Sequence, residues 1–484
     1  MYSRRQNPAI RISALRAACV AVTFAGLLST TANAGEWTIT PRIEVEQSFT
    51  DNARSVSEGL EADMITTTTA DITIDGEGRR AQLNFNYNLS RDSFWDNTEL
   101  GGLRQRLLGV GNIEAIEDHV FIDTRATITQ QSLTRGGGAS ASERTVGTND
   151  QSTVVNYSFT PNFAHRYGNW ADTDLRYTFN ETQFLDTDVG QAGVQPDASS
   201  SHQIVGLLRS GTKFARLSWE LVTTRTFTDN DSDRDSTELS GEYAWTRKLT
   251  LLGRMGREEI ENSGLGAVDE PEFFWRGGFR LNPGPRTSIR FEAGHRFGGV
   301  NFSSDASYQI GSSMELTASY EEEVRTDRQA LTANLNNLAF VDGVPNADPN
   351  ATDFDFLDQT TRQQNLNISL NGTSGRNTFT VSARASKRTQ EPQETEDTVV
   401  TFNVRLNRRL RPNLDGGVST NLSVVTESAN GIEDYTFRGN AFLSYRLMQD
   451  FTGRLNYDYL RRDSDIDTQD LEENVLSVSL SKSF

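Results

Sequence analysis

The sequence predicts a single transmembrane antiparallel β-barrel of about 22 strands, within a range of about 18 to 24. Three observations lead to this expectation. Apolar and polar residues alternate in one segment after another, which gives a strand one apolar and one polar face. Short turns alternate with longer polar loops, as periplasmic turns and extracellular loops do in such barrels. The chain also begins with the pattern of a secretion signal and ends on an amphipathic strand.

The first 34 residues read as a cleaved signal peptide. Arg4, Arg5, Arg11 and Arg16 make a positive segment without acids, residues 17–28 are apolar, and Ala32-Asn33-Ala34 is a small-residue cleavage site. We therefore expect cleavage after Ala34 and a barrel over residues 35–484. The first strand would begin within a few residues of that site, so no separate plug domain is expected before it.

Composition narrows the function classes. The formal net charge is −19, and a chain this acidic lacks the basic surface that nucleic-acid binding requires. The single cysteine, Cys19, lies in the signal peptide, so the secreted chain has no thiol, as suits an oxidising periplasm. A mean hydropathy of −0.55 is compatible with a membrane barrel, because each strand needs apolar residues on its lipid face only.

Each strand is predicted from its alternation. Residues 81–90 show it most clearly, with Ala81, Leu83, Phe85, Tyr87 and Leu89 separated by polar residues. Residues 64–74, 107–115, 120–130 and 202–210 are four further strands. The apolar sets of the others are, in order, Trp37/Ile39/Ile43/Val45/Phe49, Val155/Tyr157/Phe159/Phe163, Leu175/Tyr177/Phe179, Leu217/Trp219/Leu221, Leu239/Tyr243/Trp245, Leu249/Leu251/Met255, Phe273/Trp275/Phe279/Leu281, Ile289/Phe291/Phe297, Phe302/Tyr308/Ile310, Met314/Leu316/Tyr320, Leu366/Ile368/Leu370, Phe379/Val381, Val400/Phe402/Val404/Leu406, Leu414/Val418/Leu422, Phe437/Leu443/Tyr445 and Leu455/Tyr457/Tyr459. Gly298-Gly299 predicts an unusually tight turn on the outer side.

The last strand carries the expected assembly signal. Leu476, Val478, Leu480 and Phe484 share one face, and serines fill most positions between them. This pattern resembles the closing strand of bacterial outer-membrane barrels, which end on an aromatic residue. Lys482 departs from that pattern, since an aromatic residue is favoured third from the end. The resemblance implies recognition by the barrel-assembly machinery and by periplasmic chaperones, and contact with outer-membrane lipid and lipopolysaccharide.

Charged residues at inward positions are the candidate lumen lining. They are Glu44, Glu46, Asp172, Asp174, Glu220, Glu238, Glu242, Arg254, Arg276, Arg280, Arg290, Arg296, Arg384, Arg405, Arg438 and Arg454. Two readings remain open. Opposite charges on neighbouring strands can simply pair across the wall. Alternatively, facing walls of opposite charge create a field that orients polar solutes such as sugars.

The longest loop, residues 325–361, is a candidate constriction. Loops of this length without structure of their own are usually functional or disordered. Apolar residues would be poorly placed in a fully solvated loop, so we expect it to fold into the mouth of the lumen. There its acids would face Arg276, Arg280 and Arg290, although a flexible external loop is the alternative. The residues expected to constrict the pore are Leu338, Phe340, Asp353, Phe354, Asp355 and Phe356.

Signs of catalysis are weak. The four histidines show no metal-ligand spacing, and His295 faces lipid beside residues 302–304, where a Ser–His lipid hydrolase remains a minor alternative. Asp229, Asp231, Asp233 and Asp235 alternate like the start of a calcium loop, but Arg234 stands where an EF-hand needs glycine. We therefore expect no enzyme activity, no cofactor and no metal site.

Several short motifs resemble one family. They are Thr40-Pro41-Arg42-Ile43-Glu44-Val45, Thr50-Asp51-Asn52, Leu281-Asn282-Pro283-Gly284-Pro285-Arg286-Thr287 and His295-Arg296-Phe297-Gly298-Gly299. The chain resembles the porin-like outer-membrane barrels associated with exosortase (PEP-CTERM) and exopolysaccharide loci of Gram-negative bacteria. The resemblance implies a non-enzymatic conduit for polysaccharide or another polar solute, with exopolysaccharide export proteins as partners. A structural component of the secretion complex, with a loop-blocked lumen, is the alternative.

Overall fold

The computed structural model describes most of the chain after the expected signal peptide. The described residues are 35–132, 140–142, 151–185, 197–229, 233–260, 272–337, 339–341, 344–346, 360–390, 395–427, 431 and 433–484. The predicted signal peptide and its cleavage site lie outside these ranges.

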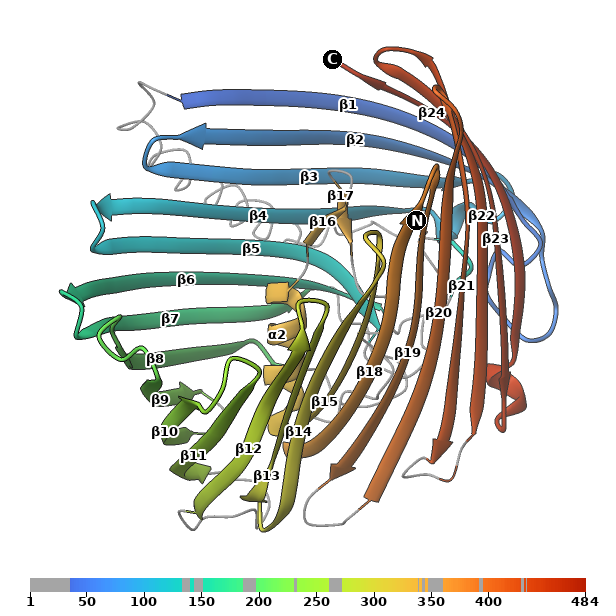
Figure 1. Ribbon diagram of the computed structural model, residues 1–484. Coiled ribbons are helices and arrows are strands. Elements are labelled where there is room, and N and C mark those ends of the chain that lie inside the picture. The colour runs from blue at the N-terminus through green and yellow to red at the C-terminus, as the bar shows by residue number, and fades with distance from the viewer. Residues whose placement is uncertain are drawn as a thin grey trace.

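The described chain forms a closed antiparallel barrel of 22 strands, as the alternation predicted (Figure 1). Each strand pairs with its neighbours in sequence, and β1 pairs with β24 to close the ring. The barrel strands are β1(Gly35–Thr50), β2(Asp63–Gly78), β3(Ala81–Phe94), β4(Gly102–Ile116), β5(Val120–Ser132), β6(Gln151–Tyr167), β7(Ala171–Leu185), β8(Ser199–Ser210), β9(Leu217–Thr228), β10(Arg234–Ala244), β11(Leu249–Ile260), β12(Glu272–Gly284), β13(Thr287–Arg296), β14(Gly299–Ile310), β15(Met314–Thr326), β18(Thr360–Ser374), β19(Asn377–Gln390), β20(Thr395–Arg411), β21(Leu414–Glu427), β22(Asp434–Met448), β23(Phe451–Ser464) and β24(Leu471–Ser483).

The remaining elements lie in three connections. Two of these connections contain a single 3-10 turn each, η1(Thr98–Leu100) between β3 and β4 and η2(Asp467–Gln469) between β23 and β24. The third connection joins β15 to β18 and contains helix α2(Asp327–Asn337) and a small hairpin of β16(Ala339–Val341) and β17(Val344–Asn346). No helix in the described ranges has the length and apolarity needed to cross a bilayer.

The two faces of the wall follow from the period of two. Ile39, Ile43 and Val45 of β1 are each about half exposed on the outer face. Glu44 and Glu46 alternate with them and point into the lumen, where they line a cavity. An apolar outer band with a polar interior is the pattern of a barrel that sits in lipid.

The loops also follow the predicted asymmetry. Turns on the side of Gly35 and Phe484 are short, such as the one between Ser374 and Asn377, and the connections at the other end are generally longer. The exception is the hairpin of β13 and β14, as expected, but its central residues are Phe297 and Gly298 rather than Gly298 and Gly299. Arg296 pairs with Gly299, and both central residues have positive φ, which is the geometry of a type I′ turn.

Hydrogen bonds hold β1 and β24 together at both ends of the seam between them. At the short-turn end, the Phe484 N–H donates to the carbonyl of Pro41 at 2.9 Å. At the long-loop end, the Asp51 carboxylate accepts hydrogen bonds of 2.8 Å from the backbone and side-chain nitrogens of Asn474. Beside it, the Asn52 side-chain amide donates to the carbonyl of Glu472 at 3.0 Å. The Thr50-Asp51-Asn52 motif is thus part of the barrel closure.

Candidate functional site

The lumen is the candidate functional site, and the predicted lining residues fall into separate groups within it. Glu44, Glu46, Arg405 and Arg454 surround one cavity. Glu238, Glu242, Arg254, Arg276, Arg280, Arg290 and Arg296 lie together on β10 to β13. Asp172 and Asp174 lie near the short-turn end of β7, where Asp172 pairs with Arg166 at 3.0 Å. Glu220, Arg384 and Arg438 lie on β9, β19 and β22, outside both groups.

The charges on β10 to β13 form a connected network along one side of the wall. Glu292 is 1% exposed and forms ion pairs with Arg254 at 2.7 Å and with Arg290 at 2.6 Å. Glu242 accepts two hydrogen bonds of 2.8 Å from Arg280, a bidentate arrangement. Pairing across neighbouring strands is therefore present here, and it neutralises most of the local charge within the wall itself.

Arg276 is the exception in this network. It is only 8% exposed, and its terminal nitrogen donates to the Ser303 hydroxyl at 3.3 Å. Within the described residues, no carboxylate lies within ion-pair distance of it. Glycine makes room for its stem, because a Cβ on Gly294 would lie 2.8 Å from the Arg276 Cγ and closer still to backbone. The acids that were expected to face Arg276 from the long loop lie outside the described residues.

A polar cavity of about 610 Å³ lies on the opposite side of the lumen, between β1 to β5 and β20 to β24. Its described lining combines arginines, carboxylates, amides and hydroxyls. The lining residues are Arg42, Glu44, Glu46, Thr67, Thr69, Asp71, Asn88, Ser90, Arg104, Gln105, Arg106, Gln130, Ala141, Ser142, Arg405, Asn440, Arg454, Asn456, Asp458 and Ser477. Such a surface offers hydrogen-bond donors and acceptors in every direction, which suits a hydroxyl-rich solute.

A loop segment from the β5–β6 connection reaches into this cavity. Ala141 and Ser142 line it, and the Ala141 N–H donates to the Glu473 carboxylate at 2.8 Å. The Ser140 hydroxyl donates to the same oxygen at 3.0 Å, and Thr50 donates to the other oxygen at 2.8 Å. Glu473 is fully buried, so one carboxylate fixes both the loop and the seam.

Two parts of this site were not predicted from the sequence: the lining by residues 104–106 and the contact between Glu473 and Ala141. The predicted strand over residues 107–115 began too late, since β4 begins at Gly102, and Arg104, Gln105 and Arg106 were therefore left out of the lining. Alternating charge and amide residues at the start of a strand give no hydrophobic period to detect. The contact between Glu473 and Ala141 joins residues far apart in sequence, and no local pattern encodes it.

Helix α2 crosses the lumen, inside the ring of strands (Figure 1). Its start has a capping box, in which Thr326 and Gln329 each accept from the other's backbone N–H at 3.2 Å. Asp327 then pairs with the buried Arg388 of β19 at 3.3 Å. At the far end, Asn336 donates to the Asn180 side chain of β7 at 3.3 Å. The helix thus connects two walls that lie many strands apart.

The six predicted constriction residues are only partly covered by the structure. Leu338, Asp353, Phe354, Asp355 and Phe356 lie outside the described residues. Phe340 lies in β16, where its backbone pairs with Pro345 of β17. The described part of this loop, α2 and its hairpin, does lie within the ring of strands.

The geometry gives little support to a Ser–His lipid hydrolase or to a calcium loop. His295 pairs with Glu272 at 3.4 Å, but Ser304 pairs with Phe291, about 13 Å away along β13 at 3.3 Å per residue. Asp229 accepts from the Ser200 N–H at 2.8 Å, Asp233 accepts from the Thr228 N–H at 3.2 Å, and Asp235 pairs with Arg225 at 3.2 Å. Three of the four acids are therefore engaged by neighbouring protein groups. Asp231 lies outside the described residues. In the described part of the chain, no group of three or more metal-binding side chains occurs.

Comparison with solved structures finds other barrels of this architecture. The siderophore receptor PirA of Acinetobacter baumannii is 10% identical, with a TM-score of 0.51 over 92% of this chain and 80% of that one. The ferric-catecholate import receptor Fiu of Escherichia coli K12 is 10% identical, with a TM-score of 0.50 over 92% and 81%. The iron transporter FrpB of Neisseria meningitidis is 11% identical, with a TM-score of 0.50 over 92% and 82%.

At such low identity the likeness concerns the fold alone. No protein-family model matches the sequence, and comparison with curated proteins finds no match. The chain therefore has a closed 22-stranded barrel fold that is similar to the fold of these receptors.

Proposed function

We propose that this protein is a non-enzymatic outer-membrane barrel that conducts a polar solute, with the cavity beneath Ala141 and Ser142 as its solute contact. The observation that carries the proposal is this cavity of about 610 Å³, whose lining is made of charged, amide and hydroxyl groups. Pores select solutes through the charges and hydrogen-bonding groups that line them. The apolar outer face and the likeness to receptor barrels support the outer-membrane location.

Polysaccharide is the solute class we favour. Repeated hydroxyls match a lining that mixes hydrogen-bond donors and acceptors. The family resemblance of the sequence motifs points to export of exopolysaccharide together with dedicated export proteins. The names of the fold neighbours suggest iron-complex uptake as the competing solute class.

A second candidate function is a scaffold with a blocked lumen. Helix α2 crosses the lumen and is fastened at Asp327 and at Asn336, and the β5–β6 segment is fastened at Glu473. Both segments narrow the path. In this alternative the barrel would organise export proteins without conducting solute itself.

Planar-bilayer recordings separate the two candidates. A stable open pore is expected for the wild type, and deletion of residues 334–353 is expected to raise its single-channel conductance. Replacing Arg461, whose pair with Asp463 is exposed at the rim, is a control that should leave conductance unchanged. A wild-type barrel that is closed, and that opens only on deletion, supports the scaffold. Unchanged conductance in a folded deletion variant would rule out constriction by this loop.

Solute preference is tested by current blockade. Acidic and neutral oligosaccharides are expected to block the pore transiently, and Asn440→Phe, which fills the cavity, should reduce blockade by about tenfold. Asn367→Phe provides the matched control, because Asn367 is an exposed lumen residue that does not line the cavity. Blockade by ferric catecholates but not by oligosaccharides would favour the competing solute class.

A further inference from the structure

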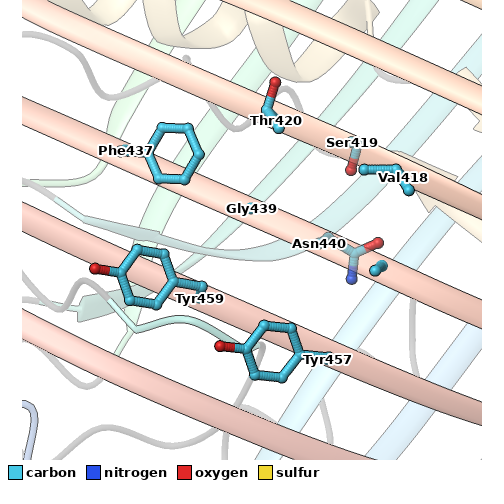
Figure 2. A pocket seen from close by; sticks show the side chains of 9 residues that line it. Val418, Ser419, Thr420, Phe437, Gly439, Asn440, Tyr457 and Tyr459 are labelled. Carbon is cyan, nitrogen blue, oxygen red and sulfur yellow. The ribbon is translucent and has the colours of Figure 1, made fainter.

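The outer face of the barrel has an apolar groove on β21 to β23. Figure 2 shows its upper part, where Phe437, Tyr457 and Tyr459 surround an opening above Gly439. This hollow has a volume of about 360 Å³. A Cβ on Gly439 would have its nearest neighbour, the Phe437 ring, at 3.4 Å, so the space above the glycine is unoccupied by other side chains. The floor of the groove is therefore the strand backbone itself.

The groove continues towards the short-turn end of the barrel. A second hollow of about 420 Å³ shares Val418, Ala441 and Tyr457 with the first, so the two are continuous. Its far end is lined by Leu443 and Arg408. Val404 of β20 pairs with Thr420, and Thr420 pairs with Gly439, so Val404 and Gly439 lie at the same height in the wall. Arg408 lies four residues further along β20, about 13 Å towards the short-turn end. That length approaches the roughly 15 Å depth of hydrocarbon in one leaflet.

An arginine at a lipid-facing position marks this end. Arg408 is exposed and lies between Leu406 and Leu410, which are 44% and 40% exposed on the outer face. Among the described residues, none provides a carboxylate within ion-pair distance of Arg408. Arg376 lies in the adjoining turn, where its guanidinium donates to the Leu410 carbonyl at 3.5 Å. Because Asn377 pairs with Arg408, the two arginines lie on adjoining strand ends at this rim.

The strand end that carries Arg408 has a further cation. Arg411 is exposed beside it, although the whole chain carries a net charge of −19. Basic residues next to an apolar surface at the membrane interface attract anionic lipid headgroups. An apolar groove of leaflet depth that ends at exposed cations fits one kind of molecule, a lipid with an anionic headgroup.

We propose that this groove binds an anionic phospholipid of the periplasmic leaflet, with an acyl chain along β22 and the phosphate between Arg408 and Arg376. The proposal rests on the outer-membrane placement given above but not on solute conduction. The small residues Gly439 and Ala441 admit the chain, the aromatic rings of the upper groove hold its sides, and the arginines select the headgroup. The binding is non-covalent and leaves the lumen unchanged.

Native mass spectrometry of the detergent-solubilised barrel tests the proposal. Phosphatidylglycerol and phosphatidylcholine with the same acyl chains are titrated separately, and heat-modifiable migration confirms that each variant is folded. The wild type is expected to retain phosphatidylglycerol about tenfold better. Arg408→Gln should abolish most of this preference, whereas Ala441→Phe and Gly439→Leu should reduce retention of both lipids by filling the groove.

Two replacements elsewhere on the outer face serve as controls. Gly253→Phe fills an open lipid-facing glycine position on β11, and Arg225→Gln removes a lipid-facing cation that lies over the Phe227 ring. Both should bind lipid like the wild type. Equal retention of the two lipids by the wild type would overturn the proposal, as would undiminished binding by folded Ala441→Phe and Gly439→Leu. Concentration-dependent dimers abolished by the same replacements would show that a second copy fills the groove instead.

Conductance separates this proposal from the proposed function. The groove variants are expected to conduct like the wild type, because every replaced group lies outside the lumen. Loss of lipid preference with normal conductance, or the reverse, therefore identifies which of the two proposals fails.

Discussion

Removing the carboxylate of Asp63 should destabilise the long-loop end of the barrel by about 3 kcal/mol, since hydrogen bonds to a charged group contribute about 1.5–3 kcal/mol each and do not add fully. Asp63 is 2% exposed at the start of β2. It accepts from the backbone N–H groups of Asp96 and Asn97 at 3.1 and 2.8 Å, and from the Asn97 side chain at 3.1 Å. Trp95 also donates to it at 3.1 Å.

Two substitutions of Asp63 should lower the unfolding free energy by different amounts. Asp63→Ala removes every acceptor and should give the full loss, whereas Asp63→Asn keeps one carbonyl oxygen and should lose about half of it. Denaturant unfolding of the refolded barrel in micelles, followed by heat-modifiable migration, measures the difference. Asp463→Ala is the control, because the pair of Asp463 with Arg461 is exposed on both sides and such pairs contribute about 0–1 kcal/mol.

The stabilisation of the barrel by Asp63 should decrease as the pH falls. Burial disfavours the charged carboxylate, but hydrogen bonds from Asn97, Asp96 and Trp95 outweigh it and hold the pKa of Asp63 below its ordinary value. A lowered pKa stabilises the fold above the unfolded value of about 3.9, and this stabilisation disappears as the pH falls through the folded pKa. The gap between wild type and Asp63→Ala should therefore narrow below about pH 4. Equal stability at pH 7, or a gap that widens in acid, would refute this reasoning.

Three further predictions concern the barrel wall. Ile368→Arg, on the lipid face of β18, should cost about 2–4 kcal/mol, while Asn367→Arg, in the lumen, should be nearly neutral; equal costs in micelle or vesicle unfolding would mean that the faces are misassigned. Deleting Phe484 should leave the chain in the periplasm, degraded or aggregated, because closure fails and a strand edge stays open; normal membrane levels of heat-modifiable barrel would contradict this. Asp51→Ala should lower the unfolding free energy by about 2–3 kcal/mol through the lost bonds to Asn474, and an unchanged midpoint would show that the seam does not depend on them.

Strand alternation was sufficient to predict the barrel, its strand number and the two faces of β1. The reason is physical: lipid on one side and water on the other impose a strict period of two on every strand. Residues such as Ile43 and Glu44 therefore reveal their faces without any tertiary information. The turn at Phe297 was misplaced by one residue, because glycine was expected at both positions of positive φ and an aromatic residue occupies one of them.

The candidate site was less accessible to sequence reasoning. Charged lumen positions such as Arg254 and Glu292 could be recognised by parity, but their pairing depends on the register of neighbouring strands. The cavity wall at Ala141 and the crossing of α2 to Asn180 depend on contacts between distant segments. Periodicity describes a strand and its two faces, whereas loops that fold back into a lumen have no period.

The seam between β1 and β24 has a kinetic consequence for folding. Every other pairing in the barrel joins strands that follow one another along the chain, so each can form as its hairpin or connection closes. The seam alone joins residues as distant as Arg42 and Ser483. Closing a loop of that size costs about 5 kcal/mol of chain entropy if the intervening chain is flexible, against about 1 kcal/mol for a short hairpin. Because prior assembly of the intervening strands into a curved sheet removes most of that cost, ring closure should be the last and rate-limiting step, with Asn474 and Phe484 engaging only after the rest of the wall exists.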